Sequence, residues 1–202
     1  LAVVAVEDER FYEHHGVDYQ GVARAMILNL RAGTIVQGGS TITEQFVKNA
    51  LEAQNSRTVF QKFREAALAY QIERHWDKDK ILTEYLNTVY FGSGAYGVEA
   101  AARTYFESNH PGCGTDELPC AEVLTPAEAA LMAGIVQNPY GYDPKINPEA
   151  ALLRRNTVLQ KMLEQGFITQ DQYDESIKEA LPAASEISPP KIDSEAPYFT
   201  SW

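Results

Sequence analysis

The chain has few cysteines and few basic residues, and both shortages exclude functions. Its 202 residues contain two cysteines, and 17 lysines and arginines stand against 28 aspartates and glutamates, which gives a formal net charge of −11. Proteins that bind the phosphate backbone of a nucleic acid need a basic surface, so nucleic acid is excluded as a partner. Two cysteines are also too few to form a tetrahedral metal site by themselves.

Long apolar runs are absent as well. No stretch approaches the roughly 20 apolar residues that span a bilayer, and no signal peptide is visible. The chain nevertheless opens directly on the apolar run Leu1–Val6, and its last residues, 194–202, belong to no predicted element. We therefore expect a domain cut from a longer protein.

Sustained alternation of apolar and polar residues, the mark of a half-buried strand, is also missing. Helix start and stop signals follow one another instead, including the capping boxes Thr41/Glu44, Thr125/Glu128 and Thr169/Gln172. Segments so marked begin near Asp18, Thr41, Thr58, Asp77, Val98, Thr125, Asn147 and Thr169. The pattern predicts an all-α domain of roughly eight to ten helices over residues 1–182, with residues 183–202 as a linker.

The two cysteines, Cys113 and Cys120, lie in a loop rich in glycine and proline. This spacing can close a small disulfide loop, which would indicate an oxidising compartment. Two free thiols are the alternative, but a buried thiol does not suit so polar a loop.

Glu7 is the first candidate for catalysis. It follows the apolar run and precedes Phe11, Tyr12 and two histidines. Partial burial among such groups would raise the pKa of its carboxyl and suit it to general-base catalysis. The alternative is a solvated acidic patch at a helix end.

Residues 38–43, Gly-Gly-Ser-Thr-Ile-Thr, run directly into a helix that carries Lys48. Free backbone N–H groups, hydroxyls and a fixed cation together suit an anionic leaving group. A plain helix cap is the alternative, with Lys48 paired to Glu44 four residues earlier.

A further charged cluster consists of Arg57, Lys62, Arg64 and Glu65. Lys62 and Glu65 are three residues apart on a helix, so both can face one cleft, although a solvated helix face is the simpler interpretation. The adjacent cations Arg154 and Arg155, near the start of another helix, are interpreted as structural residues that hold helices together, for example through ion pairs with acidic groups.

Taken in order, these motifs resemble the peptidoglycan glycosyltransferase domain, the lysozyme-like family found in bifunctional penicillin-binding proteins and in monofunctional glycosyltransferases. Five blocks carry the resemblance: Glu7–Gly16, Gly38–Gln45, Gln61–Glu65, Lys78–Asn87 and Arg154–Leu159. The resemblance implies an all-α, lysozyme-like fold with a larger head lobe and a small membrane-facing jaw lobe that contains Met26–Leu30.

The family polymerises lipid II, a disaccharide-pentapeptide on undecaprenyl diphosphate, at the extracytoplasmic face of the bacterial membrane. The resemblance makes Glu7 the base that deprotonates the acceptor 4-hydroxyl, and Glu65 the second catalytic carboxylate, which supports the donor site. It implies substrate-binding roles for Asp8, Phe11, His14, Ser40, Thr41, Thr43, Glu44, Gln45, Lys48, Arg57 and Lys62.

The resemblance also carries expectations about cofactors and partners. No cofactor is required by the sequence, although a divalent cation, Mg or Mn, often assists the family. The expected partners are lipid II, the growing glycan strand, the membrane surface and other cell-wall synthesis proteins. The parent is expected to be a class A penicillin-binding protein with a preceding membrane anchor. The extracellular setting also favours a disulfide between Cys113 and Cys120 over two free thiols.

Two positions depart from the family pattern. Glu44 stands where the family has glutamine, and Gln61 stands where it has arginine. Glutamate still completes the capping box, but both changes make the expected diphosphate site less positive. If these changes abolish activity, the chain would be a non-catalytic domain that binds glycan or lipid. A second rival function is a lysozyme-like hydrolase, which would need no diphosphate site.

Overall fold

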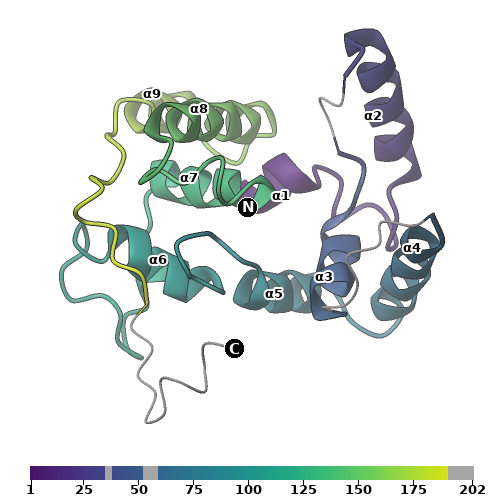
Figure 1. Cartoon of the computed structure of the whole chain (residues 1–202), viewed down its shortest axis with the longest axis horizontal. Coiled ribbons are helices and arrows are strands. Elements are labelled where there is room, and N and C mark those ends of the chain that lie inside the picture. Colours follow the sequence, from purple (N-terminus) through teal and green to yellow (C-terminus); the bar gives the residue numbers. More distant parts are fainter. Residues whose placement is uncertain (35–37, 52–58, 191–202) are drawn as a thin grey trace.

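The computed structural model describes residues 1–34, 38–51 and 59–190, so Arg57 lies outside the described residues. The described part is helical and contains no strand, only isolated bridges, which confirms the all-α prediction (Figure 1). Its elements are α1 (Ala2–Glu7), α2 (Tyr19–Ala32), α3 (Ile42–Ala50), α4 (Val59–Glu73), α5 (Lys78–Thr88), α6 (Val98–Phe106), the 3₁₀ turn η1 (Cys120–Glu122), α7 (Pro126–Gln137), α8 (Pro148–Glu164) and α9 (Gln170–Ser176).

Helix α7 forms the centre of the core. Its residues are apolar on every side except for Glu128 and the last residue, Gln137, as expected of a helix surrounded by protein. It packs against α8 and against the short helix α1, whose residues Ala2–Ala5 are buried. Because α1 is anchored in this way, its last residue, Glu7, is held at the edge of the core.

Helix α3 is fixed to the end of α1 and packs on α4 and α5. The Asp8 carboxylate accepts a hydrogen bond of 3.0 Å from the backbone N–H of Ile42 in the first turn of α3. The predicted capping box is present: Thr41 accepts from the Glu44 N–H, and the Glu44 carboxylate accepts from the Thr41 N–H. Glutamate at position 44 therefore preserves the start of this helix.

Helix α2 stands away from the rest of the molecule, in dark blue in Figure 1. Among its residues only Ala25 is buried, whereas Met26, Ile27, Leu28 and Leu30 are exposed. This separated apolar helix agrees with the small lobe that the sequence predicted around Met26–Leu30.

The predicted caps are confirmed at Thr125 and Thr169 but are wrong in detail at Asp18 and Asn147. Asp18 occupies the N-cap position of α2, yet its carboxylate pairs with the Arg10 guanidinium at 2.9 Å instead of bonding the helix N–H groups. Asn147 similarly donates its amide to a loop carbonyl. In both cases a tertiary partner takes the side chain that local geometry would assign to the helix.

Arg155 is a structural residue, as the sequence suggested. It is 1% exposed, and its guanidinium donates to the backbone carbonyls of Ile177 and Glu179. These hydrogen bonds fix the chain after α9 to α8. Arg155 therefore holds the helices through backbone carbonyl groups and not through the ion pair that the sequence suggested.

The Cys113–Cys120 disulfide is formed. After α9 the described chain continues along the domain: Ile187 is 3% exposed and the Ser188 N–H donates to the Thr104 carbonyl. The limit between domain and linker at residue 182 stays a prediction.

Candidate active site

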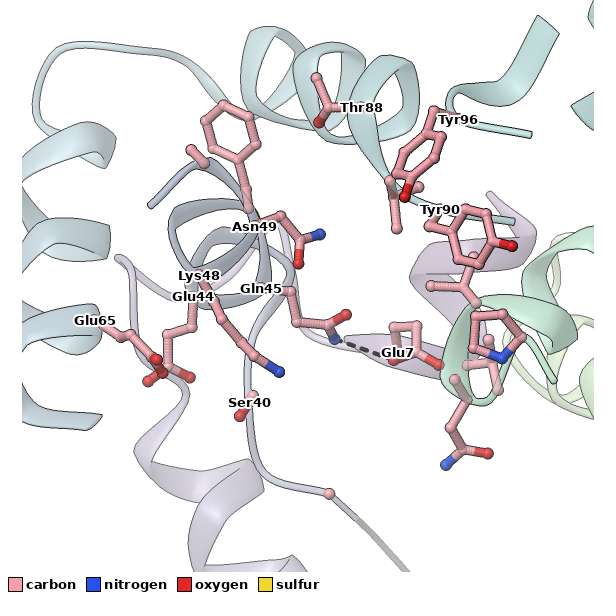
Figure 2. Close-up of a pocket in the computed structure, with 18 of the residues that line it drawn as sticks. Glu7, Ser40, Glu44, Gln45, Lys48, Asn49, Glu65, Thr88, Tyr90 and Tyr96 are labelled. Carbon is pink, nitrogen blue, oxygen red and sulfur yellow. Dashed lines mark hydrogen bonds between the residues drawn. The ribbon is translucent and has the colours of Figure 1, made fainter. Parts of the chain in front are cut away.

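A cleft of about 1150 Å³ lies among α1, α3, α4, α5 and α8, and Figure 2 shows side chains that line it. Glu7 lies in this cleft beside Gln45 of α3. Lys48, Lys62 and Glu65 also line the cleft, while Tyr90 and Tyr96 lie at another part of its wall. Two blocks that are more than thirty residues apart in the sequence therefore meet at one site.

The Glu7 carboxylate is nearly enclosed, with 11% of its side chain exposed. Gln45 Nε2 donates to Glu7 Oε2 at 3.0 Å, and Arg154 Nη2 lies 3.6 Å from Glu7 Oε1. Burial raises the pKa of Glu7, although the Gln45 hydrogen bond and the Arg154 and Lys161 charges oppose this shift. The raised pKa predicted from the sequence is confirmed, and a carboxylate of this kind can accept a proton.

Lys62 is the centre of a charged cluster in the same cleft. Its Nζ lies 2.8 Å from Ser40 Oγ, 3.2 Å from Glu44 Oε1 and 3.5 Å from Glu65 Oε2. Lys62 and Glu65 thus face one cleft, as their spacing predicted. Glu44 pairs with Lys62 of α4, whereas Lys48 is exposed and, in Figure 2, reaches toward Ser40.

Other predicted substrate-binding residues do not line the large cleft: Asp8, Phe11, His14, Thr41 and Thr43. All of them are buried. Asp8 pairs with His14 Nε2 at 2.9 Å, and Thr43 donates to Glu73. Asp8 and Thr41 line a second cavity of about 30 Å³, which shares Glu7 and Ser40 with the large cleft. That these residues bind substrate stays a prediction.

Sequence reasoning missed several residues that the fold brings to Glu7. Arg154 was interpreted only as structural, and Lys161 was not considered. Both lie on α8, seven residues apart, and both line the cleft. A spacing of seven places two residues on the same face of a helix, so this signal was available. Tyr85, whose hydroxyl donates to Gln45, lies in the block Lys78–Asn87 that carries the family resemblance, but the sequence analysis gave it no role in the site.

No group of three or more metal-binding side chains is assembled within the described residues. In the same part of the chain no helix is long and apolar enough to cross a membrane.

The fold and the cleft together define a class of protein. A partly desolvated carboxylate that can take a proton lies in one cleft with lysines that can neutralise an anion. Such an arrangement can support a group-transfer reaction with an anionic leaving group.

Comparison with known proteins gives the family. Residues 1–163 match the transglycosylase family. Penicillin-binding protein 1A of Aquifex aeolicus (strain VF5) is 48% identical over 185 residues, which are 92% of this chain and 24% of that protein. Penicillin-binding protein 2D of Bacillus subtilis (strain 168) is 43% identical over 201 residues, which are 98% of this chain and 27% of that protein. A crystal structure of penicillin-binding protein 1A from Haemophilus influenzae is 29% identical, with a TM-score of 0.44, and the match covers 69% of this chain and 16% of that chain.

The chain belongs to the transglycosylase family and is a peptidoglycan glycosyltransferase domain of the kind found in class A penicillin-binding proteins. It spans about a quarter of the length of these curated relatives.

Proposed function

We propose that the domain polymerises lipid II into β-1,4-linked glycan strands, with Glu7 as the general base. Glu7 takes the proton of the acceptor 4-hydroxyl while that oxygen bonds to C1 of the donor sugar. The bond from C1 to the diphosphate oxygen breaks, undecaprenyl diphosphate leaves with the electron pair, and the anomeric centre is inverted.

The environment of Glu7 is the observation that carries this proposal. Burial raises the pKa of its carboxyl, so it is a stronger base than an ordinary glutamate. Gln45 and Arg154 each favour the ionised form of the Glu7 carboxyl, and the ionised form is the one that can accept a proton. A base that balances these influences suits proton transfer near neutral pH.

The charged cluster around Lys62 supports the second half of the reaction. Lys62 and Lys48 line the same cleft as Glu7, and Ser40 Oγ lies 2.8 Å from Lys62 Nζ. Two ammonium groups and a hydroxyl can stabilise the negative charge that develops on a departing diphosphate. We assign Glu65 a supporting role, because its carboxylate lies 3.5 Å from Lys62 Nζ and orients that cation.

A divalent cation that assists the reaction stays a prediction. The described residues provide no cluster of three or more carboxylate, imidazole or thiolate groups to hold one. No step of the proposed reaction depends on a metal.

We propose that α2 contacts the membrane that carries the lipid substrate. Its residues Met26 and Leu30 are 63% and 72% exposed, and Phe60 and Phe63 of α4 are 80% and 73% exposed. Apolar side chains so exposed are expected to bury in the interfacial region of a bilayer. Such contact would hold the cleft at the extracytoplasmic membrane surface.

The decisive experiment is polymerisation of labelled lipid II in detergent by the wild-type domain and by Glu7→Gln. Loss of the general base should reduce the polymerisation rate by a factor of about 10² to 10⁴. Glu13→Gln is the matched control, because Glu13 is exposed and makes only a surface pair with Arg10. It removes the same charge from the same segment and should leave the rate unchanged.

This assay and a second one, digestion of isolated cell-wall glycan, together separate the glycosyltransferase from a hydrolase. Loss of polymer only in Glu7→Gln supports the glycosyltransferase and its base. Digestion of isolated cell-wall glycan, without polymer from lipid II, would indicate a hydrolase. Equal polymerisation by wild type and Glu7→Gln would show that Glu7 is not the base.

A further inference from the structure

Three side chains from three helices form a continuous hydrogen-bonded path to the catalytic carboxylate. The Tyr85 hydroxyl of α5 donates to Gln45 Oε1 of α3 at 2.9 Å. Gln45 Nε2 then donates to Glu7 Oε2 of α1 at 3.0 Å, the bond drawn as a dashed line in Figure 2. Tyr85 is fully buried and does not line the cleft, so it has no route to the substrate except through Gln45.

The path fixes which end of the Gln45 amide faces Glu7. An amide presents an acceptor at one end and a donor at the other, and a half-turn exchanges them. Such a half-turn would put an N–H₂ group against the Tyr85 hydroxyl, and the buried O–H would lose its acceptor, which is costly. Burial and the nearby Glu7 charge also raise the pKa of Tyr85, so the hydroxyl keeps its proton and remains a donor.

The orientation of the amide matters because Glu7 changes charge during the reaction. An ionised carboxylate is supported by an N–H donor, whereas a protonated carboxyl would be supported by a carbonyl acceptor. With its N–H held toward Glu7, Gln45 favours only the ionised form, which is the form that can act as a base.

We propose that Tyr85 is a positioning residue for the glycosyltransfer reaction: it holds the Gln45 amide with its N–H toward Glu7, so that the carboxylate is kept ready to accept a proton. This inference rests on the proposed role of Glu7 as the general base. Tyr85 itself touches neither substrate nor reacting atoms.

The charged groups around Glu7 do not depend on Tyr85. Arg154 and Lys161 of α8 favour the ionised carboxylate, and the adjacent Asp8 opposes it. Replacing Tyr85 with phenylalanine leaves all of these charges in place.

The titratable groups on the other helices near Glu7 are also left unchanged by Tyr85→Phe. On α7 the titratable side chain is Glu128, which is paired with His110 at 2.7 Å. On α3, Glu44 is paired with Lys62, and Lys48 is exposed. A change in the titration of Glu7 in Tyr85→Phe would therefore report on the amide.

The test is Tyr85→Phe with two independent measurements of Glu7. The first is the pH profile of lipid II polymerisation, with kcat and KM determined separately. The second is a ¹³C NMR titration of the domain labelled at glutamate, in which the Glu7 signal is the one lost in Glu7→Gln. We expect both the acid limb of kcat and the NMR midpoint to move up by about half to one pH unit, with the donor KM unchanged.

Tyr105→Phe is the matched control. Tyr105 is also fully buried, and its hydroxyl donates to a backbone carbonyl, that of Phe91, rather than to a cleft residue. It should lose similar thermal stability through deletion of a buried hydroxyl, without moving either titration.

Gln45→Met, alone and combined with Tyr85→Phe, shows whether Tyr85 acts through the amide. Gln45→Met should shift the Glu7 midpoint upward, and Tyr85→Phe should add no further shift in that background. If Tyr85→Phe does not fold, Gln45→Met alone still tests whether the amide lowers the pKa of Glu7.

Three results would overturn the proposal: an unchanged Glu7 midpoint in folded Tyr85→Phe, an equal shift in Tyr105→Phe, or a full additional shift in the Gln45→Met background. Failure of the proposed function is distinguishable from these. If Glu7 is not the base, the NMR midpoint still moves while the acid limb of kcat stays in place.

Discussion

Glu44 lies in the charged part of the cleft, where its carboxylate would compete with the diphosphate of the proposed substrate for Lys62. Its side chain is 3% exposed, and its Oε1 lies 3.2 Å from Lys62 Nζ. Glu44→Gln removes this charge while the amide oxygen can still complete the capping box with Thr41. The substitution therefore changes the electrostatics of the site without removing the start of α3.

The size of the effect follows from the exposure of Lys62. Two unit charges 3.2 Å apart attract by about 1.3 kcal/mol at the dielectric constant of water and by about 5 kcal/mol at an effective value of 20. Because the Lys62 side chain is 49% exposed, solvent screening favours the lower value, about 1 kcal/mol. Releasing Lys62 to the diphosphate should therefore lower the donor KM about fivefold.

The assay is steady-state polymerisation of lipid II over a range of donor concentrations, with thermal unfolding as a check on folding. Glu175→Gln is the control, because Glu175 is exposed on α9 and does not line the cleft. It removes the same charge from the protein and should leave KM unchanged. An unchanged or higher KM in a fully folded Glu44→Gln protein would refute the competition between Glu44 and the diphosphate.

Three other variants test the site and the fold. Arg154→Met removes a cation whose Nη2 lies 3.6 Å from Glu7 Oε1, so the pKa of Glu7 should rise further. Because the base must be ionised, the acid limb of the pH–rate profile should move to higher pH by up to about one unit. Replacing Cys113 and Cys120 with serine opens a disulfide whose partners are 7 residues apart. The free energy of unfolding in urea should fall by about 2 kcal/mol, and Tm by about 4–8 °C. Gly16→Ala should cost more than about 2 kcal/mol in the same urea titration. Gly16 has φ +86°, and an added Cβ would lie 2.7 Å from a backbone nitrogen of α4.

The Arg154 and Gly16 predictions each have a contrasting variant. Arg103→Met removes a cation that pairs with a surface glutamate on the same helix, so it should leave the rate profile in place. Gly112→Ala has a similar backbone, φ +93°, but open space around the added Cβ. It should cost only about 1 kcal/mol, and an equal loss in both glycine variants would remove the steric argument for Gly16.

Local sequence signals were sufficient for the helices and for the identity of the main groups in the cleft. The capping boxes at Thr41, Thr125 and Thr169 formed as predicted, because a cap depends on contacts within four residues. The motifs also indicated Glu7 as a candidate base and Lys62 with Glu65 as neighbours on one helix face. These inferences needed only chemistry and short-range geometry.

What the tertiary structure decided is the environment of those groups. Glu7 has a raised pKa because α1 is packed against α7 and α8, more than a hundred residues away in the chain. The same packing brings Arg154 to the Glu7 carboxylate, whereas the sequence analysis gave Arg154 only a structural role between helices. Desolvation depends on everything that surrounds a carboxylate, so no local pattern can determine it.

The difference is clearest at Gln45 and Glu44. The sequence by itself determined that position 44 closes a cap and that position 45 follows it on the same helix. Only the fold decided that Gln45 bridges Tyr85 and Glu7, and that Glu44 pairs with Lys62 rather than with Lys48. The physical reason is that a cap is completed within one turn of helix, whereas a partner across a cleft exists only after separate helices have packed.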